Sequence, residues 1–352
     1  MKDYLASAYP GLAEQLPKIR LADLPTAIAE QSLSTPKGRR KIAIKRDDLT
    51  GRLYGGNKVR KLEYLLRRAS DRHAKRIATF GTVASNHALA TALYAKSLGF
   101  ECTCLLSHQS RTANAARMLN MQLHNGSEIV AYGGSYADRV RTLRRYLWHR
   151  QAWVIPAGGS NWLGTVGFVN AGLELAAQIL AGETESPDRL YVATGTMATA
   201  VGLSLGLTLA GLATEIQAVR VTEKFICNPE AMRRLTIKTA KILHNLDPSI
   251  PVDLAERTRY RLRDGFLAGG YARTDAATDD AVRIARDELD LALETTYTGK
   301  AMAAMLHDLD QAAHARQSVL FWNTYNSRPL PANSGQPKDV SRLPKEFLRY
   351  FD

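Results

Sequence analysis

Short β-rich runs alternate with helical patterns along most of this 352-residue chain, and this order limits the folds open to it. Parallel strands need crossover connections long enough to hold a helix, so the alternation predicts parallel sheets with helices on their faces. Strands are predicted at residues 77–81, 102–106, 128–132, 153–156, 190–194, 215–221 and 318–322, and helices near 164–180, 200–210, 279–290 and 300–314. We therefore expect an α/β fold, in a chain long enough for about two domains.

A lysine stands where a glycine-rich turn enters a helix. In Gly55-Gly56-Asn57-Lys58, Asn57 can act as the helix N-cap, because apolar residues recur at helical spacing from Val59 onward. Lys58 then falls in the first turn, where the positive end of the helix dipole opposes a cation. The same field lowers the pKa of the lysine and raises the fraction of free amine, which is a nucleophile.

Most lysines near helix starts are solvated surface groups, and we expect Lys45 and Lys61 to be of that kind. Lys58 differs because Gly55 and Gly56 let the backbone approach a ligand closely, while the helix buries its other face. Lys58 is therefore the first candidate for a catalytic residue.

The segment from residue 44 to residue 66 resembles the active-site lysine segment of the pyridoxal-phosphate enzymes grouped as 1-aminocyclopropane-1-carboxylate deaminase and D-cysteine desulfhydrase. The resemblance implies that Lys58 forms the internal aldimine with pyridoxal 5'-phosphate. It also implies a homodimer of the tryptophan synthase β-like fold (fold type II), with two open twisted, mainly parallel sheets flanked by helices. Residues 1–73 plus 169–352 would form the large cofactor-binding domain, and residues 74–168 a small inserted α/β domain.

A second turn, Ser85-Asn86-His87, follows the strand predicted at residues 77–81 and begins a helix. At the carboxyl end of a parallel strand, backbone N–H groups and a helix terminus can receive an anion. Taken alone, Ser85 or Asn86 is simply a helix cap. The turn resembles the family's Ser-Asn-His or Ser-Asn-Gln turn, which implies that Asn86 bonds the phenolic oxygen of the cofactor and Ser85 lies against the substrate carboxylate. His87 is either a neighbour of that carboxylate or a structural residue.

A phosphate needs its own cradle, and the turn after the strand at residues 190–194 has the necessary form. Backbone amides of such a turn and the helix start that follows it can surround an anion, although the turn can also be a plain structural link. It resembles the family's phosphate loop, which implies that the cofactor is bound by Gly195, Thr196, Met197, Ala198 and Thr199. Met197 and Ala198 stand where the family has glycines. Their Cβ atoms restrict positive φ values, so we expect a differently shaped loop.

Two tyrosines are the candidate auxiliary catalysts. Residues 265–271 resemble the family's Gly-Pro-Gly-Tyr turn, and residues 296–302 match its Tyr-Thr-Gly-Lys-Ala block. The resemblance implies that Tyr297 and Tyr271 face the substrate, where a phenol can hold the carboxylate or exchange a proton if neighbouring cations lower its pKa. Tyr271 can equally be a packed residue with one hydrogen bond. We expect Lys300 to serve structure at the helix start.

The last predicted strand resembles the family's strand that ends in His-Thr-Gly-Gly or His-Leu-Gly-Gly. If Thr324 matches the threonine, a hydroxyl meets the pyridine nitrogen, and the cofactor is a weaker electron sink suited to elimination. Tyr325 and Asn326 replace the paired glycines and are expected to reshape the substrate pocket. The deaminases resemble one another in a glutamate after the substrate tyrosine and a leucine at the end of the strand. This chain has Thr298 and Thr324 there, which is similar to the desulfhydrases.

The resemblance therefore implies a lyase acting on a small amino acid, most like D-cysteine desulfhydrase. In such an enzyme the amine of Lys58 removes the Cα proton, a β-leaving group such as thiolate departs, and hydrolysis gives pyruvate and ammonia. A 1-aminocyclopropane-1-carboxylate deaminase is the alternative. Because several glycine turns are substituted, a catalytically impaired paralogue that still binds the cofactor also stays open.

The formal net charge of +13 raises the question of a nucleic-acid partner. The densest basic stretch, residues 139–150, sets Val140, Leu143 and Leu147 on one stripe and its arginines largely elsewhere, as in an amphipathic helix with a solvated face. Neither a helix-turn-helix, nor zinc-ligand spacing, nor an aromatic RNA-binding signature accompanies it. We expect no nucleic-acid partner and no metal.

The cysteines and the hydropathy bear on the compartment. Cys102 and Cys104 lie two apart in a predicted strand, point to one face and cannot easily bridge each other. Together with Cys227 they are expected to be reduced thiols in a cytoplasmic protein. Nothing resembles a signal peptide, and we expect no apolar run long enough to span a membrane.

Overall fold

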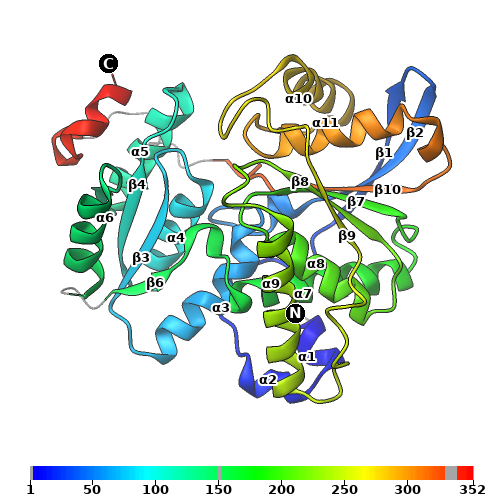
Figure 1. The fold of residues 1–352 in the computed structure, drawn as a ribbon, viewed down its shortest axis with the longest axis horizontal. Coiled ribbons are helices and arrows are strands. Elements are labelled where there is room, and N and C mark those ends of the chain that lie inside the picture. Colours follow the sequence, from blue (N-terminus) through cyan, green and yellow to red (C-terminus); the bar gives the residue numbers. More distant parts are fainter. Residues whose placement is uncertain (1–2, 149–151, 330–338, 352) are drawn as a thin grey trace.

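The computed structural model describes residues 3–148, 152–329 and 339–351, which form two sheets flanked by helices (Figure 1). In spatial order the six-stranded sheet contains β1 (Ile28–Thr35), β2 (Gly38–Lys45), β10 (Val319–Trp322), β7 (Arg189–Thr194), β8 (Glu215–Arg220) and β9 (Tyr260–Arg263). The four-stranded sheet contains β5 (Glu128–Ala131), β4 (Glu101–Ser107), β3 (Arg76–Thr82) and β6 (Trp153–Ile155). All neighbouring strands are parallel except those of the β1–β2 hairpin. The α/β class and the seven predicted strands are confirmed.

Helices cover both faces of the six-stranded sheet (Figure 1). One face carries α10 (Ala276–Leu289) and α11 (Thr298–Leu309); the other carries α7 (Trp162–Leu180) and α8 (Ala198–Leu209), with α9 (Pro229–Leu246) packed against them. The remaining helices are α1 (Tyr4–Ala8), α2 (Gly11–Gln15), α3 (Lys58–Asp71), α4 (Asn86–Ser97), α5 (Ala113–Asn125) and α6 (Tyr136–Leu143). The four helices predicted after residue 160 are present. The last of them ends earlier than predicted, and a separate short turn occupies residues 312–314.

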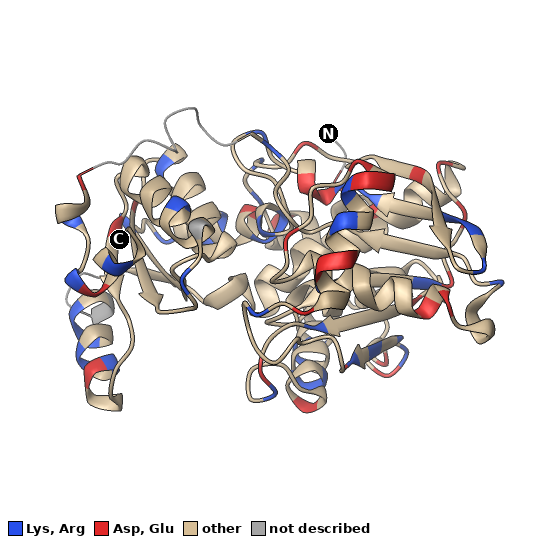
Figure 2. Cartoon of the chain, turned by 90° about the horizontal axis from the view of Figure 1, so that it is seen from above, with Lys and Arg blue, Asp and Glu red and all other residues tan. Residues whose placement is uncertain are grey.

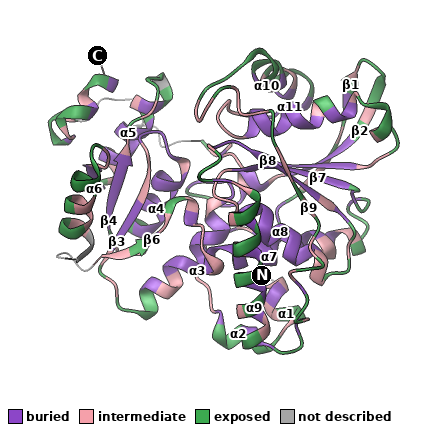
Figure 3. Cartoon of the chain, viewed as in Figure 1, coloured by how far each residue is buried: buried purple, intermediate pink, exposed green. Residues whose placement is uncertain are grey.

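Strand β7 shows how a central strand is packed on both of its faces. Its side chains alternate between the two faces, so that Tyr191 and Ala193 pack in the cluster under α10 and α11, while Leu190 and Val192 pack in the cluster over α7 and α8. All six residues of the strand are buried, as in the core of a sheet covered on both sides (Figure 3). The carboxyl ends of β7 and β10 point to the same edge of this sheet, because the two strands are parallel neighbours.

The two sheets use different stretches of chain, since β3 to β6 all lie between residues 76 and 155. The C-terminal turns, Val340–Arg342 and Lys345–Tyr350, return to the smaller sheet and pack against α5 (Figure 1). Helix α7 runs unbroken through residue 168. The division into a domain of residues 74–168 and a domain made of the rest of the chain stays a prediction.

Helix α7 corrects one expectation. Its 19 residues are long and apolar enough, by length and composition, to cross a membrane. However, 78% of its most apolar window is buried inside the protein, as is common for the core helix of a soluble fold. Two polar side chains in it have internal partners: Asn170 Oδ1 accepts a hydrogen bond from the backbone N–H of Leu5 at 2.8 Å, and Glu174 binds two buried cations. Within the described chain α7 is therefore a core helix.

A buried ionic network joins α3 to α7 and β2. Arg60 in α3 contacts Asp47 at 2.6 Å and Glu174 at 2.9 Å, and Lys45 Nζ contacts Glu174 at 2.7 Å. Although burial opposes ionisation of Glu174, Arg60 and Lys45 hold the pKa of its carboxyl at about 2. Lys45 was expected to be a solvated surface group, but it is 0% exposed. Its amine forms a buried ion pair with Glu174, which lies far away in the sequence. The network fixes the helix that begins with Lys58.

The basic stretch lies on the surface in the described part of the chain. Helix α6 has no buried side chain, Val140 and Leu143 are half-buried, and the arginines at 141, 144 and 145 are exposed. The helix is shorter than expected, because a five-residue π-helical turn, Arg144–Trp148, follows it; residues 149–151 lie outside the described residues. Figure 2 shows basic and acidic residues interspersed over the molecule. The interpretation of this stretch as a solvated helix face is confirmed for the residues described.

The three cysteines are free and buried. The sulfur atoms of Cys102 and Cys104 lie 4.0 Å apart on β4, so they share one face of the strand without being bonded. The expectation of reduced thiols agrees with this arrangement.

Candidate active site

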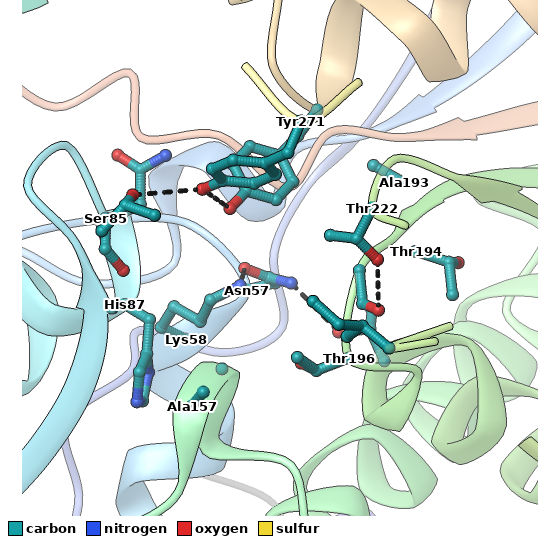
Figure 4. A pocket seen from close by; sticks show the side chains of 18 of the residues that line it. Asn57, Lys58, Ser85, His87, Ala157, Ala193, Thr194, Thr196, Thr222 and Tyr271 are labelled. Atoms are coloured by element: carbon teal, nitrogen blue, oxygen red, sulfur yellow. Dashed lines mark hydrogen bonds between the residues drawn. The ribbon is translucent and has the colours of Figure 1, made fainter. Parts of the chain in front are cut away.

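A cavity of about 380 Å³ lies between the two sheets and collects residues from all the segments singled out in the sequence. Lys58 and Asn57 lie between Ser85 on one side and Thr196 on the other, with Tyr271 above them in the view of Figure 4. The predicted site residues that line the cavity are Lys58, Ser85, Asn86, Gly195, Thr196, Met197, Thr199, Tyr271, Tyr297 and Thr324. Ala198 alone among the predicted residues does not line it.

Lys58 is the first residue of α3, as predicted, and its side chain lies in the cavity. Desolvation lowers the pKa of its amine to about 8, against an opposing pull from Glu294. The amine donates a hydrogen bond to Asn57 Oδ1 at 2.8 Å. At pH 7 about a tenth of Lys58 is therefore neutral, far more than for an ordinary lysine, and the neutral form is the one that can attack a carbonyl.

Asn57 occupies the N-cap position, but the expectation that its side chain caps the helix is wrong. Its Oδ1 accepts from Lys58, and its Nδ2 donates to Thr199 Oγ1 at 3.0 Å. Its backbone N–H donates to the carbonyl oxygen of Thr324 at 3.2 Å. Asn57 therefore ties the lysine to the turn after β7 and to the segment after β10.

Gly56 explains the double glycine before Asn57. Its φ is +88°, and a Cβ atom there would lie 2.7 Å from the backbone oxygen of Thr324. A side chain would both strain the backbone and separate the two segments. Gly56 is therefore required by the close approach of two backbone segments, whereas the sequence suggested a close approach of the backbone to a ligand.

Lys61 corrects a second expectation, because it is 2% exposed and lines the cavity instead of facing solvent. Burial, and then the charge of Lys58, lower the pKa of Lys61 well below its ordinary range. Its Nζ donates to the carbonyl oxygen of Gly158 at 3.1 Å, and no carboxylate within the described residues forms an ion pair with it. Burial without a counter-charge therefore favours the neutral amine, and an anionic ligand beside Lys61 would favour the return of its positive charge.

The turn after β7 forms the wall of the cavity near Lys61. Thr196 Oγ1 accepts a hydrogen bond from Ser160 at 2.6 Å. Thr222 Oγ1 donates to the carbonyl oxygen of Gly195 at 3.0 Å (Figure 4). Helix α8 begins here, so its N-terminal backbone dipoles point toward the wall. The backbone N–H of Ala198 donates to the carbonyl oxygen of Thr196 at 2.9 Å, so this amide is already used within the loop.

Met197 adopts a backbone conformation that favours glycine. Its φ is +68°, in the left-handed region that a Cβ atom restricts. A non-glycine residue there costs on the order of 1–2 kcal/mol, which the surrounding packing must offset. The loop therefore holds local strain at Met197, and the expectation that its shape differs from that of the family stays a prediction.

We expect Met197→Val to lower the free energy of unfolding by about 1–2 kcal/mol, because a β-branched side chain is far less tolerant of positive φ than methionine. Met197→Gly, which removes the strain together with the side chain, should remain closer to the wild type. Urea denaturation of the three proteins measures the difference. Equal stability of the valine and glycine variants would contradict the strained geometry.

A second pair of glycines faces the same wall, and the sequence interpretation missed it. Gly158 and Gly159 follow β6 and both have positive φ, +66° and +62°. A Cβ atom on Gly158 would lie 2.1 Å from Thr196 Oγ1. Gly-Gly-Ser-Asn directly after a predicted strand was a usable signal of the kind recognised at Gly55-Gly56.

Ser85, Asn86 and His87 lie at the start of α4, beside the cavity. Ser85 caps α4, accepting from the N–H of Ala88 at 3.2 Å, and also lines the cavity. Asn86 is the first residue of the helix. His87 is buried, with its Nε2 2.9 Å from the hydroxyl of Thr79, and burial, then Lys58 and Lys61, hold its pKa well below the ordinary value. A neutral, hydrogen-bonded histidine favours the structural interpretation of His87.

Tyr271 and Tyr297 meet at their hydroxyls, 2.5 Å apart. Burial raises the pKa of both phenols, so the lowered pKa that would favour proton exchange is absent at these two tyrosines. Both remain protonated and act as hydrogen-bond donors at neutral pH. Lys300 holds the preceding turn by donating to the carbonyl oxygens of Leu267 at 2.8 Å and Gly270 at 3.1 Å, which confirms its structural role.

Glu294 was missed by the sequence interpretation although it lines the cavity. Its carboxylate accepts from the backbone N–H groups of Thr296, Tyr297 and Thr298 at 2.8–2.9 Å, where α11 begins. Burial raises its pKa in spite of these bonds. The hydroxyl of Thr298 also bonds Glu294, at 3.3 Å, and Thr298 does not line the cavity. An acidic residue shortly before a helix start was the signal available for Glu294.

The segment after β10 closes the cavity. Thr324 and Tyr325 line it, while Asn326 lies behind them and accepts a hydrogen bond from the backbone N–H of Gly55 at 2.6 Å. Tyr325 therefore occupies cavity space, as expected of a side chain that replaces a glycine, and Asn326 instead holds the double-glycine turn.

Known proteins resemble this chain in sequence and in fold. Residues 19–324 match the protein family described as "Pyridoxal-phosphate dependent enzyme". A D-cysteine desulfhydrase of Yersinia enterocolitica is 33% identical over 313 residues, covering 84% of this chain and 89% of that protein. A nocardicin C-9' epimerase of Nocardia uniformis is 31% identical over 344 residues, covering 96% of this chain and 99% of that protein. A crystal structure of an ACC deaminase homologue superposes with a TM-score of 0.75 at 27% identity, covering 99% of this chain and all of that one.

Proposed function

Because this chain belongs to the family of pyridoxal-phosphate dependent enzymes, we propose that it is a lyase that converts D-cysteine and water to pyruvate, ammonia and hydrogen sulfide. The observation that carries the proposal is that Lys58, Ser85 and the paired hydroxyls of Tyr271 and Tyr297 line one cavity in a chain whose relatives include D-cysteine desulfhydrases. A 1-aminocyclopropane-1-carboxylate deaminase is the alternative substrate assignment, supported by the likeness to an ACC deaminase homologue.

The cavity fits the cofactor chemically. Lys58 offers a buried amine with a lowered pKa. Lys61, the N-terminus of α8 and the hydroxyl of Thr196 offer a donor-rich wall for a phosphate, beside which Lys61 would carry its positive charge. Asn86 would hold the phenolic oxygen, and Thr324 the pyridine nitrogen. Backbone amides of Gly195, Met197 and Thr199 complete the proposed phosphate site, from which Ala198 is removed as a donor.

Pyridoxal phosphate supplies an electron sink that stabilises negative charge at the substrate Cα. The released amine of Lys58 would take the Cα proton, for which its pKa of about 8 is well placed near neutral pH. The protonated phenols of Tyr297 and Tyr271 would donate to the substrate carboxylate or give a proton to the departing thiolate. Ser85 would hold the carboxylate from the other side.

The test is to supply the purified, cofactor-loaded protein with D-cysteine, L-cysteine, D-serine and 1-aminocyclopropane-1-carboxylate and to measure pyruvate, ammonia and sulfide. Pyruvate, ammonia and sulfide in equal amounts from D-cysteine would support the proposal. Ammonia with 2-oxobutyrate from the cyclopropane substrate would instead support the deaminase. A protein that absorbs above about 400 nm, as expected of a bound pyridoxal cofactor, yet releases no keto acid would be a catalytically impaired paralogue.

The epimerase among the relatives makes one further outcome worth measuring. That relative covers nearly the whole chain, and reversal of configuration needs the same proton removal from Cα. Chiral chromatography of each amino acid after incubation would detect it. Loss of optical purity without release of ammonia would mean that the protein is an epimerase or racemase instead of a lyase.

Lys61→Met tests the proposed phosphate site, because methionine keeps a long, unbranched side chain and removes the amine. We expect the Kd for pyridoxal 5'-phosphate to rise about tenfold or more, as for loss of a charge-assisted hydrogen bond. The Kd for pyridoxal, which lacks the phosphate, should change much less. Fluorescence titration with both compounds measures the effect, and equal losses for the two would contradict the assignment.

The proposed enzyme is a cytoplasmic homodimer that acts on a small amino acid and needs no nucleic-acid or membrane partner. The free, buried cysteines support a reducing compartment, and light scattering measures the dimer. Steep salt-dependent binding to DNA without cofactor, retained after Lys58→Ala, would point to a nucleic-acid function instead.

A further inference from the structure

The hydroxyl of Tyr54 reaches the amide of Asn86 across 32 residues of sequence. Tyr54 Oη donates a hydrogen bond to Asn86 Oδ1 at 2.8 Å. Burial raises the pKa of this phenol strongly, so it is protonated at every pH of interest and can donate. Tyr54 is 3% exposed and belongs to the turn that leads into Gly55-Gly56.

The backbone of Tyr54 is fixed from the same helix that carries Asn86. Tyr94, two turns further along α4, donates from its hydroxyl to the carbonyl oxygen of Tyr54 at 2.6 Å and lies 3.3 Å from its backbone nitrogen. On the other side, the N–H of Gly55 donates to Asn326 Oδ1 at 2.6 Å. The hydroxyl of Tyr54 is therefore held at a defined place relative to the start of α4.

The bond leaves the other half of the Asn86 amide available. An amide has one acceptor oxygen and one donor NH₂ group, and they point in different directions. Since Tyr54 occupies the oxygen, and no bond from Nδ2 to another residue is seen in the described chain, the NH₂ group is the part of Asn86 presented to the cavity that it lines. Without the bond, the side chain could turn either its oxygen or its nitrogen to the ligand.

We propose that Tyr54 is a positioning residue that orients the Asn86 amide so that its NH₂ group, not its oxygen, faces the phenolic oxygen of pyridoxal phosphate. This inference rests on the proposed cofactor role of Asn86. The phenolic oxygen carries negative charge when the cofactor is bound, so a fixed donor stabilises it, whereas an amide oxygen there would repel it. Tyr54 itself need not touch the cofactor.

The expected effect of losing the hydroxyl can be stated for two measurements. Tyr54→Phe keeps the ring and should raise the Kd for pyridoxal phosphate about three- to tenfold, the effect of one net hydrogen bond. It should also move to higher pH the midpoint at which the loaded protein loses its visible absorbance. Negative charge that is no longer stabilised on the phenolic oxygen favours the protonated form of the neighbouring nitrogen contributed by Lys58.

A double-mutant cycle isolates the orienting role. Tyr54→Phe, Asn86→Ala and the double variant are loaded with pyridoxal phosphate and titrated, with the wild type alongside. If Tyr54 acts through Asn86, the Tyr54 substitution changes the Kd and the pH midpoint in the wild type but adds nothing when Asn86 is already alanine. Tyr191→Phe is the matched control, because it removes another buried hydroxyl, bonded to Asp308 at 2.7 Å in the sheet, and should leave both measurements unchanged.

Other outcomes overturn the inference. An unchanged Kd and midpoint in Tyr54→Phe, or the same shift with and without Asn86, would exclude the orienting role while the wild type still binds the cofactor. A wild type that never takes up pyridoxal phosphate would instead sink the proposed function. If Tyr54→Phe fails to fold, as judged by circular dichroism, a crystal structure of the loaded wild type decides: an Asn86 side chain that has left Tyr54 would also overturn it.

Discussion

Lys58→Ala is expected to lower the turnover of any substrate by about 10³-fold or more, since it removes both the covalent attachment and the base for the Cα proton. The visible absorbance of the protein incubated with pyridoxal phosphate should disappear with it. The physical reason is that Lys58 is the amine with a pKa of about 8 in the cavity, where Lys61 alone among the other lining residues carries a second amine. The measurements are the absorbance spectrum and the release of keto acid.

The exposed lysine at position 75 gives a matched control, because Lys75→Ala removes a charge from the surface of the same protein. That variant should keep the spectrum and the activity of the wild type. If Lys58→Ala stays coloured after dialysis and borohydride fixes the cofactor to another lysine, Lys61 becomes the candidate and the assignment of the two amines is wrong.

Glu174→Gln is expected to lower the free energy of unfolding by about 3–5 kcal/mol, because it leaves Arg60 and Lys45 in the interior with too little negative charge. Both cations contact the Glu174 carboxylate directly, whereas the other carboxylate of the network, Asp47, forms an ion pair with Arg60 and none with Lys45. Urea denaturation measures the loss. The exposed glutamate at position 185 supplies the control, since Glu185→Gln should change stability by less than about 0.5 kcal/mol.

The same carboxylate predicts how stability depends on pH. The pKa of Glu174 is about 2 in the folded chain against an ordinary value of 4.5. A depressed pKa means that its contribution is complete above pH 4.5 and is lost as the pH falls from there toward 2. The wild type should therefore lose more stability than Glu174→Gln between those values. An identical acid response of the two proteins would contradict the ionised, paired state of Glu174.

The sequence predicts the parallel core of this fold well, because strands that are buried on both faces appear in it as short, mainly apolar runs. It does not predict the β1–β2 hairpin, whose second strand places Lys45 in the interior. The burial of that lysine depends on Glu174, 129 residues further along the chain, and no local pattern carries that information. Helix α7 was predicted as a helix, but its length of apolar sequence was not. That apolar character reflects its central place in the packing.

In the site, the motifs predict which segments meet but not which atoms are used. Asn57 stands at the predicted N-cap, yet its side chain serves Lys58 and Thr199, because the helix start is turned toward the cavity. Lys61 lies one turn from Lys58 and so shares its side of α3, a spacing that could have placed it in the cavity. The contact between Tyr54 and Asn86 arises only when the two sheets come together. Long-range contacts of this kind are set by tertiary packing.

Lys58, Asn86 and Tyr297 all stand at helix starts, and Gly195 and Thr324 stand just beyond strand ends. A substitution at such a position interrupts no strand pairing and removes no helical residue from the core. A substitution of a lining residue such as Tyr325 is therefore expected to change the shape of the cavity while the two sheets stay folded.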